Sequence, residues 1–216
     1  QFDAPMLLRL TTRVSHSRTP IELGERVEVE LKPYEKNAAK RVMVPANSRA
    51  RHIVVEQRMK ELVEFAETTP LNRIEKGGKI GVITSGITYQ YAKEALGDKA
   101  SYLKLGLVNP LPVKLIKDFA ASVDELYVLE ELDDVLETHC AKIGVACKGK
   151  ELFSLCGEYT ASTIKKVILG EEVKTLEAHK VPNRPPVLCP GCPHRGIFHV
   201  ISSMKLYVSG DIGCYS

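Results

Sequence analysis

Short apolar runs alternate with longer amphipathic segments along the middle of the chain. Runs such as "KIGVITSG" at 79–86 are typical of buried strands, whereas apolar residues that recur every three to four positions are typical of helices. Gly97 closes one periodic segment and Pro112 opens another, as at many helix ends. The alternation predicts an α/β fold, a three-layer sandwich around a parallel sheet. We expect strands within 79–86, 101–112 and 125–132, and helices within 87–97, 112–122, 133–144 and 160–170.

The N-terminal part of the chain has a different pattern. Residues 6–12, "MLLRLTT", have the apolar and branched character of a strand, and the polar stretch after them is predicted to be a loop. A long helix is predicted from about Ser48 to Thr68, capped by Asn47 or Ser48 and stopped by Pro70. The apolar side chains expected to share one face of this helix are Ile53, Met59, Leu62, Val63 and Ala66.

Toward the C-terminus, the stretch "EAHKVPNRPPV" at 177–187 is rich in proline and charge and is typical of a linker. After it we expect a helix at about 195–204 and a strand over 205–210. Because the chain starts at Gln1 and no helix follows the last strand, we expect an excerpt of a longer protein in which only the middle domain is whole. The expected segments are 1–32, 33–78, 79–180 and 181–216.

Composition excludes several classes of protein. With 44% apolar and 26% charged residues among 216, the chain has the ordinary mix of a globular protein. No apolar run approaches the roughly 20 residues of a membrane span. The formal charge of +3 is dispersed, which argues against nucleic acid as the main partner. Six cysteines without the spacing of a disulfide scaffold favour reduced thiols and a cytoplasmic location.

The stretch "LCPGCPHRG" at 188–196 combines a CxxC pair with a histidine and an arginine. Such a pair is half of a zinc or iron–sulfur site, for which His194, His199 and Cys214 are the further candidates. A redox pair is a second interpretation, although such pairs normally start a helix directly after a strand. Phosphate binding is the third and accounts for the most residues. Arg195 begins a helix, and the glycines of "GDIGC" at 210–214 let backbone amides approach an anion.

Other chemistry-bearing residues fit structural roles. Cys140, Cys147 and Cys156 have no paired spacing and are expected to be core or surface thiols. The acidic run from Glu130 to Asp134 could suggest a metal site. A strand end followed by a helix cap and a first-turn charge accounts for this run with fewer assumptions.

Two of these motifs together resemble a known family. The residues "RPPVLCPGCPHRGIF" at 184–198, followed by "VSGDIGCY" at 208–215, are similar to the start of the thiamine diphosphate domain in alpha subunits of indolepyruvate:ferredoxin oxidoreductases. These enzymes belong to the 2-oxoacid:ferredoxin oxidoreductase superfamily. Segments 7–17 and 42–52 look like the first-domain tail and the connector of those subunits. Segment 104–112 is similar to their middle domain, which is related to the C-terminal domain of transketolases.

The resemblance implies a domain organisation over essentially the whole chain. The fold class would be an α/β, three-layer parallel-sheet sandwich like the transketolase C-terminal domain, flanked by partial thiamine-diphosphate-binding domains. Residues 1–32 would be the tail of the pyrimidine-binding domain and 33–78 a connector with a long helix. Residues 79–180 would be the transketolase C-terminal-like domain with its linker, and 181–216 the start of the diphosphate-binding domain.

The resemblance also implies a cofactor pocket with two walls. His194 is the expected catalytic group, either handling a proton or facing the substrate, and the alternative is that it only hydrogen-bonds the loop. No residue of this chain is expected to bind a metal. The expected cofactor-binding residues are Cys189, Gly191, Cys192 and Arg195 in the first wall, and Gly210, Asp211, Gly213, Cys214 and Tyr215 in the second.

Enzymes of this family convert arylpyruvates and CoA to aryl-acetyl-CoA, CO2 and reduced ferredoxin. The resemblance therefore implies thiamine diphosphate as cofactor, and a beta subunit, ferredoxin, CoA and a 2-oxoacid as partners. Mg2+ and [4Fe-4S] clusters are expected in the full-length protein with ligands outside this sequence, because "GDIG" lacks the family's magnesium-binding element. The chain alone is expected to be inactive. The alternative function is a non-catalytic α/β subunit-assembly module with a small Cys/His metal knuckle.

Overall fold

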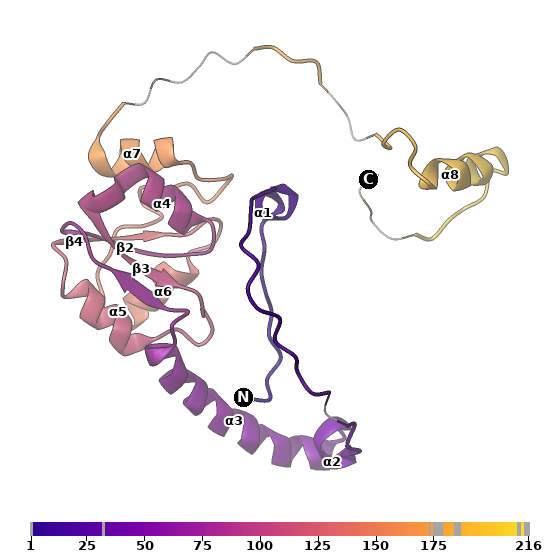
Figure 1. The fold of residues 1–216 in the computed structure, drawn as a ribbon, viewed down its shortest axis with the longest axis horizontal. Coiled ribbons are helices and arrows are strands. Elements are labelled where there is room, and N and C mark those ends of the chain that lie inside the picture. The colour runs from indigo at the N-terminus through magenta and orange to yellow at the C-terminus, as the bar shows by residue number, and fades with distance from the viewer. Residues whose placement is uncertain are drawn as a thin grey trace. The chain divides into compact units, whose positions relative to one another are not determined.

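A four-stranded mixed sheet organises the first of two compact units, Gln1–Val173, in the computed structural model of the chain (Figure 1). The second unit is Lys174–Ser216. The structure describes residues 2–31, 33–172, 174, 179–183, 187–210 and 213.

The sheet has the strand order β1-β3-β2-β4. β2 pairs in parallel with both neighbours, so that Val82 lies opposite Tyr102 on one side and Tyr127 on the other. β1 runs antiparallel to β3, and the prediction of a wholly parallel sheet is therefore wrong. β1 escaped the sequence pattern because this short edge strand is mostly exposed and has no apolar run. The strands are β1 (Arg73–Glu75), β2 (Ile80–Ser85), β3 (Ala100–Leu105) and β4 (Glu125–Leu129).

Helices cover both faces of the sheet (Figure 1). Strand side chains alternate between the two faces: Val82 packs with α4 and α7, whereas Ile83 packs with α5 and α6. Burial on both faces explains why each strand is a nearly continuous apolar run. The predicted α/β class is confirmed, and so is each strand and helix predicted between 79 and 170. The helices are α4 (Thr88–Leu96), α5 (Val113–Ala120), α6 (Val135–Lys142) and α7 (Ala161–Leu169), with a short 3-10 turn, η1 (Gly97–Lys99), after α4.

The strand predicted over residues 6–12 is wrong. Instead, α1 (Thr12–His16) begins at the end of this segment, and the Thr11 hydroxyl caps it by accepting the Val14 amide proton at 3.3 Å. A strand needs a hydrogen-bonded neighbour, and within the described part of the chain no strand pairs with this segment. The apolar side chains that consequently stay exposed are Met6, Leu7, Leu8 and Leu10.

The long helix α3 (Pro45–Thr68) is confirmed, but it begins earlier than predicted. Pro45 occupies its first turn, where the missing amide proton removes no helical hydrogen bond. Asn47 is inside the helix and does not cap it; its side chain donates to the Val42 carbonyl at 2.9 Å, just after the short helix α2 (Ala38–Arg41). Of the residues predicted to share one face, Ala66 is buried and Met59 and Leu62 are half-buried, whereas Ile53 and Val63 are exposed.

Asn72 fastens the C-terminal end of α3 to the sheet. Its side chain is 7% exposed, and its amide nitrogen donates to the Ala66 carbonyl at 2.9 Å. Its amide oxygen accepts the backbone N–H groups of Gly106 and Leu107, each at 2.9 Å, just beyond the end of β3. One side chain therefore links three segments of the unit.

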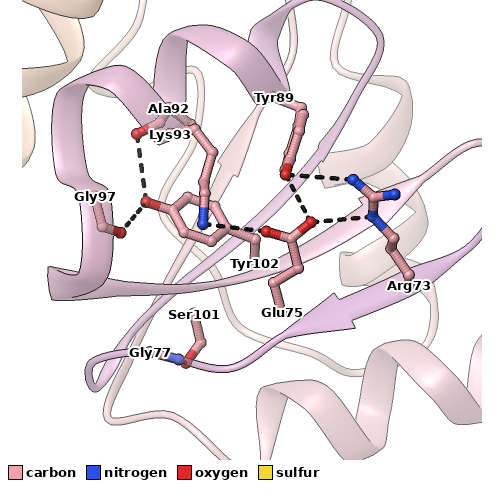
Figure 2. Close-up of polar contacts among 9 residues, drawn as sticks. All are labelled: Arg73, Glu75, Gly77, Tyr89, Ala92, Lys93, Gly97, Ser101 and Tyr102. Atoms are coloured by element: carbon pink, nitrogen blue, oxygen red, sulfur yellow. Dashed lines mark hydrogen bonds and ion pairs between the residues drawn. The ribbon is translucent and has the colours of Figure 1, made fainter. Parts of the chain in front are cut away.

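A polar cluster surrounds Glu75 at the end of β1 (Figure 2). The Tyr89 hydroxyl donates to Glu75 Oε1 at 2.6 Å, and Arg73 Nε donates to the same oxygen at 3.0 Å. Lys93 Nζ lies 3.1 Å from Glu75 Oε2. The Tyr89 hydroxyl bond and these cations hold the pKa of Glu75 below its ordinary value of 4.5. Beside them, burial raises the pKa of Tyr102 to about 12.

We expect Glu75→Gln to lower the free energy of unfolding by about 1 kcal/mol at pH 7. Because the folded state depresses the pKa of Glu75, the ionised carboxylate stabilises the protein above the ordinary pKa of 4.5. That contribution is lost as the pH falls through the folded-state pKa, so the difference between wild type and variant shrinks in acid. Urea unfolding at neutral pH and near pH 3 measures it, with exposed Glu94→Gln as control. A difference that stays constant with pH would contradict the assignment.

Candidate functional site

The sheet has one point where successive connections diverge, at the carboxyl end of β2. The chain leaves β2 toward α4 on one face, but it leaves the neighbouring strands β3 and β4 toward α5 and α6 on the other face. In open α/β sheets, ligands bind outside the carboxyl ends of strands at such a topological switch point. The first candidate site is therefore the edge formed by Ser85 to Thr88.

Thr88 holds this edge together. Its hydroxyl lies 2.8 Å from the Thr84 hydroxyl and 2.6 Å from the Ser85 carbonyl oxygen. It also lies 3.3 Å from the carbonyl oxygen of Leu129, at the end of β4. Beside it, Gly86 is exposed, and a Cβ at this position would meet no atom within 4 Å. The edge is thus cross-linked by polar contacts at Thr88 and open at Gly86.

Glu130 follows the last residue of the neighbouring strand β4. Its Oε2 accepts the Leu136 amide at 2.8 Å and its Oε1 accepts the Glu137 amide at 2.9 Å, so it caps α6. Burial raises the pKa of this carboxyl group, which is 8% exposed. The interpretation of the acidic run as a strand end and a helix cap is confirmed. The capping side chain is Glu130, however, because Asp134 makes no side-chain cap bond.

A carboxylate that is distant in sequence caps helix α5 in the same way. Glu67 of α3 accepts the amides of Lys114 and Leu115 at 2.8 and 2.7 Å. No side chain caps α4, whose first residue, Thr88, comes two residues after Gly86. The partial positive charge of helix N-terminal amides favours anions, so a small anionic group is the ligand class that suits this edge.

The second candidate is the cysteine loop, residues 188–195, in the C-terminal unit. The Cys192 amide donates to the Cys189 carbonyl at 3.1 Å and closes a tight turn. Between them lie Pro190 and Gly191, and Gly191 has φ +76°. Proline followed by a glycine in the left-handed region is the signature of a type II turn, and a β-carbon would strain this position.

Arg195 ties the cysteine loop to α8 (His194–Ser203). Its Nη1 donates to the Leu188 carbonyl at 2.9 Å, across the base of the loop. The His194 ring stacks on Phe198 one turn along α8, with ring centroids 5.9 Å apart. The structure therefore brings the whole first wall, Cys189, Gly191, Cys192, His194 and Arg195, into one short loop and helix start.

The second predicted wall is described only in part. Gly210 and Gly213 lie outside any helix or strand, and Asp211, Cys214 and Tyr215 fall outside the described residues. The strand expected over 205–210 is wrong, because no other segment in the described part of the chain pairs with it. That the two walls share one ligand stays a prediction.

Within the described ranges, no group of three or more histidine, cysteine, aspartate or glutamate side chains is arranged to hold a metal ion. The cysteines that the structure describes are free thiols. Cys214, one of the further ligands considered for a metal knuckle, lies outside those ranges. None of the described helices is long and apolar enough to cross a bilayer.

Sequence reasoning missed the edge at Ser85 to Thr88 and the cap that Glu67 provides to α5. A signal for the edge was present, since a buried apolar run ends in Gly86 and a helix starts two residues later. Glu67 offered no such signal. Its partners on α5 are far along the chain, and only the packing of α3 against the sheet unit brings them together.

Comparison with known proteins places the whole chain among curated relatives. It is 34% identical to "Indolepyruvate oxidoreductase subunit IorA" of Methanothermobacter marburgensis, 31% to that of Archaeoglobus fulgidus and 32% to that of Pyrococcus horikoshii. Each comparison covers 100% of this chain, which spans about 40% of the length of these relatives. No protein-family model matches. A 2-oxoglutarate:ferredoxin oxidoreductase from Magnetococcus marinus, solved with 2-oxoglutarate, coenzyme A and succinyl-CoA, is similar over 59% of this chain and 23% of its own, with TM-score 0.45 and 20% identity.

Proposed function

Because the chain is homologous over its whole length to the IorA subunit of indolepyruvate oxidoreductases, we propose that it is part of the catalytic subunit of a thiamine-diphosphate-dependent 2-oxoacid:ferredoxin oxidoreductase. The observation that carries the proposal is identity of 31–34% with no part of the chain left unmatched. The reaction would convert an arylpyruvate such as indolepyruvate, with CoA, to aryl-acetyl-CoA and CO2 and pass two electrons to ferredoxin.

The residues of the cysteine loop fit a diphosphate. A guanidinium has five N–H donors, and the bond from Arg195 to Leu188 uses one of them. No side chain caps α8, so its first amides add positive potential beside Arg195. A Cβ at Gly191 would meet no atom within 4 Å, so that an anion has room to reach the turn. Arg195, Gly191 and the turn between Cys189 and Cys192 would therefore hold the diphosphate, with Gly210, Asp211, Gly213, Cys214 and Tyr215 as the second wall.

Bound thiamine diphosphate supplies the nucleophile for the keto carbon and the electron sink for decarboxylation. The contribution of this chain is to bind and orient that group. His194 would hold or release a proton close to the substrate, because an imidazole can act as general acid or base. Its stacking on Phe198 fixes the plane of the ring. We also assign the first unit to the transketolase C-terminal type.

The same proposal includes a beta subunit, ferredoxin, CoA and the 2-oxoacid as partners, and Mg2+ and [4Fe-4S] clusters held by other parts of the full-length enzyme. It also includes a cytoplasmic location. The alternative is a subunit-assembly module without catalysis. The two are separated by the reaction itself: the full-length subunit with its beta partner should reduce ferredoxin only when a 2-oxoacid, CoA and thiamine diphosphate are all present. Absence of reduction with every arylpyruvate tested would favour the assembly module.

We expect Arg195→Ala in the full-length enzyme to weaken thiamine diphosphate binding about tenfold, because one charge-assisted contact to the diphosphate is removed. Calorimetric titration of the apoenzyme with the cofactor measures the affinity. Lys180→Ala, an exposed cation of the same unit, is the matched control and should change nothing. Because Arg195 also holds Leu188, thermal melting of both variants is needed to show that the fold survives. Unchanged affinity in Arg195→Ala would remove this residue from the pocket.

A further inference from the structure

Two thiols of the first unit pack against each other on the face of the sheet that α5 and α6 cover. Cys140 of α6 is fully buried in the core cluster of that face. Cys147 packs against the same cluster and is half-buried, so it is the less buried residue of the pair. Neither residue belongs to the two candidate sites described above.

The end of α6 brings these cysteines together. Gly144, with φ +78°, donates its amide to the Ala141 carbonyl at 3.1 Å, and Val145 donates to the Cys140 carbonyl at 2.8 Å. This pair of bonds is a Schellman motif, which reverses the chain at a helix C-terminus. Cys147 follows the reversal and returns to the helix turn that carries Cys140.

The segment after the reversal is also anchored on its other side. Lys148 forms a parallel bridge with Tyr127 beside β4. Its amide donates to the Leu126 carbonyl and its carbonyl accepts the Val128 amide, both at 2.9 Å. Cys147 is thus held between a paired backbone and the core cluster that contains Cys140.

The two thiols influence each other, and this makes them chemically unequal. The neighbouring Cys140 thiol lowers the pKa of Cys147. The Cys147 sulfur, together with burial, raises the pKa of Cys140. The less buried member of the pair is therefore the one that ionises first, and thiolates are the form that reacts with oxidants.

We propose that Cys140 and Cys147 are a modification site, at which a peroxide converts the two thiols to a reversible intramolecular disulfide. The Cys147 thiolate attacks one peroxide oxygen, the O–O bond breaks, and a sulfenic acid and hydroxide result. The Cys140 sulfur then attacks the Cys147 sulfur, the S–O bond breaks, and the oxygen leaves as water with the Cys140 proton. Two thiols lose two electrons in total, and one peroxide gains them and becomes two water molecules.

The sequence provides a direct assay for this disulfide. Trypsin cleaves after Lys142 and Lys148, so Cys140 and Cys147 fall on separate peptides that only a disulfide can join. The full chain is treated with hydrogen peroxide, remaining thiols are blocked with N-ethylmaleimide, and the digest is analysed by mass spectrometry without reduction. We expect the joined peptides to increase about tenfold over the untreated protein and to disappear after dithiothreitol.

Variants test the assigned roles of the two sulfurs. Cys140→Ala should leave Cys147 as a sulfenic acid that dimedone traps, because the resolving thiol is gone. Cys147→Ser should abolish both the joined peptides and the dimedone adduct at this site. The exposed Cys156 provides the matched control, since Cys156→Ser should form the link as the wild type does.

Several results would overturn the proposal. One is sulfinic acid on Cys147 of the wild type with no joined peptides, which would mean that Cys140 cannot reach it. Another is a link from either residue to Cys156, Cys189 or Cys192. Because the assay on the wild type needs no substitution in the core, a variant that fails to fold does not decide the outcome. The assay also needs neither cofactor nor substrate, so it stands apart from the function proposed above.

Discussion

Replacing Asn72 by alanine is expected to lower the free energy of unfolding by about 3 kcal/mol, which reduces the folding equilibrium constant more than about 100-fold. The variant loses three hydrogen bonds at once, each worth about 1 kcal/mol: one to the end of α3 and two to the backbone beyond β3. Urea unfolding followed by circular dichroism measures the loss.

Asn37→Ala is the matched control for Asn72. Asn37 also bonds a backbone amide through its side chain, to Lys40 at 3.0 Å, but it is exposed and caps only the short α2. We expect this variant to lose less than about 1 kcal/mol. Asn72→Asp should fall between the two, because it keeps the acceptor oxygen and loses the bond to Ala66. Equal losses in Asn72→Ala and Asn37→Ala would show that Asn72 does not fasten α3 to the sheet.

The second large effect is expected at Glu130, where substitution by alanine should lower the free energy of unfolding by about 2 kcal/mol. The variant leaves the second and third amides of α6 without their carboxylate partner in a nearly closed environment. Asp134→Ala is the control, because Asp134 occupies the N-cap position without a side-chain cap bond and should contribute little. A loss in Asp134→Ala as large as that in Glu130→Ala would contradict the assignment of the cap.

Glu130 also has a pH signature opposite to that of Glu75. Burial raises its folded-state pKa above 4.5, so the folded state binds the proton more tightly than the unfolded chain. Stability therefore declines as the pH rises from about 4.5 through the raised pKa, where the buried group must ionise. Glu130→Gln lacks this decline. The stability of the wild type relative to Glu130→Gln should fall across that interval, and a rise would refute the direction of the shift.

The elements between residues 79 and 170 were predictable because their signals are local and agree with one another. Each parallel strand is a run buried on both faces, and helix ends coincide with residues such as Gly97 and Gly170 that the pattern already marks. The predicted strands at 6–12 and 205–210 failed for a common reason. Apolar and branched residues favour extended backbone, but a strand forms only where another strand offers its hydrogen bonds, and local sequence does not reveal that partner.

The same distinction between local and distant partners applies to the functional features. The cysteine loop was recognisable because its turn, its bond from Arg195 to Leu188 and its helix start all lie within a few residues. Asn72 and Glu67 were not recognisable, since their partners are distant in sequence and come together only in the folded unit. The Cys140 and Cys147 pair is intermediate. Both residues were noted as thiols, and only the reversal at Gly144 reveals that they meet.

The attachment of α3 has a mechanical consequence. Its 24 residues form a stiff rod about 36 Å long, at ~1.5 Å per residue. The hydrogen bonds of Asn72 and Glu67 attach α3 at its C-terminal end only. They lie next to the C-terminal end of β3 and the N-terminal end of α5. For a helix of this length, a tilt of about 10° at that attachment would move the Pro45 end by roughly 6 Å. A force applied to the Pro45 end of α3 would therefore act on the start of α5 with a large mechanical advantage.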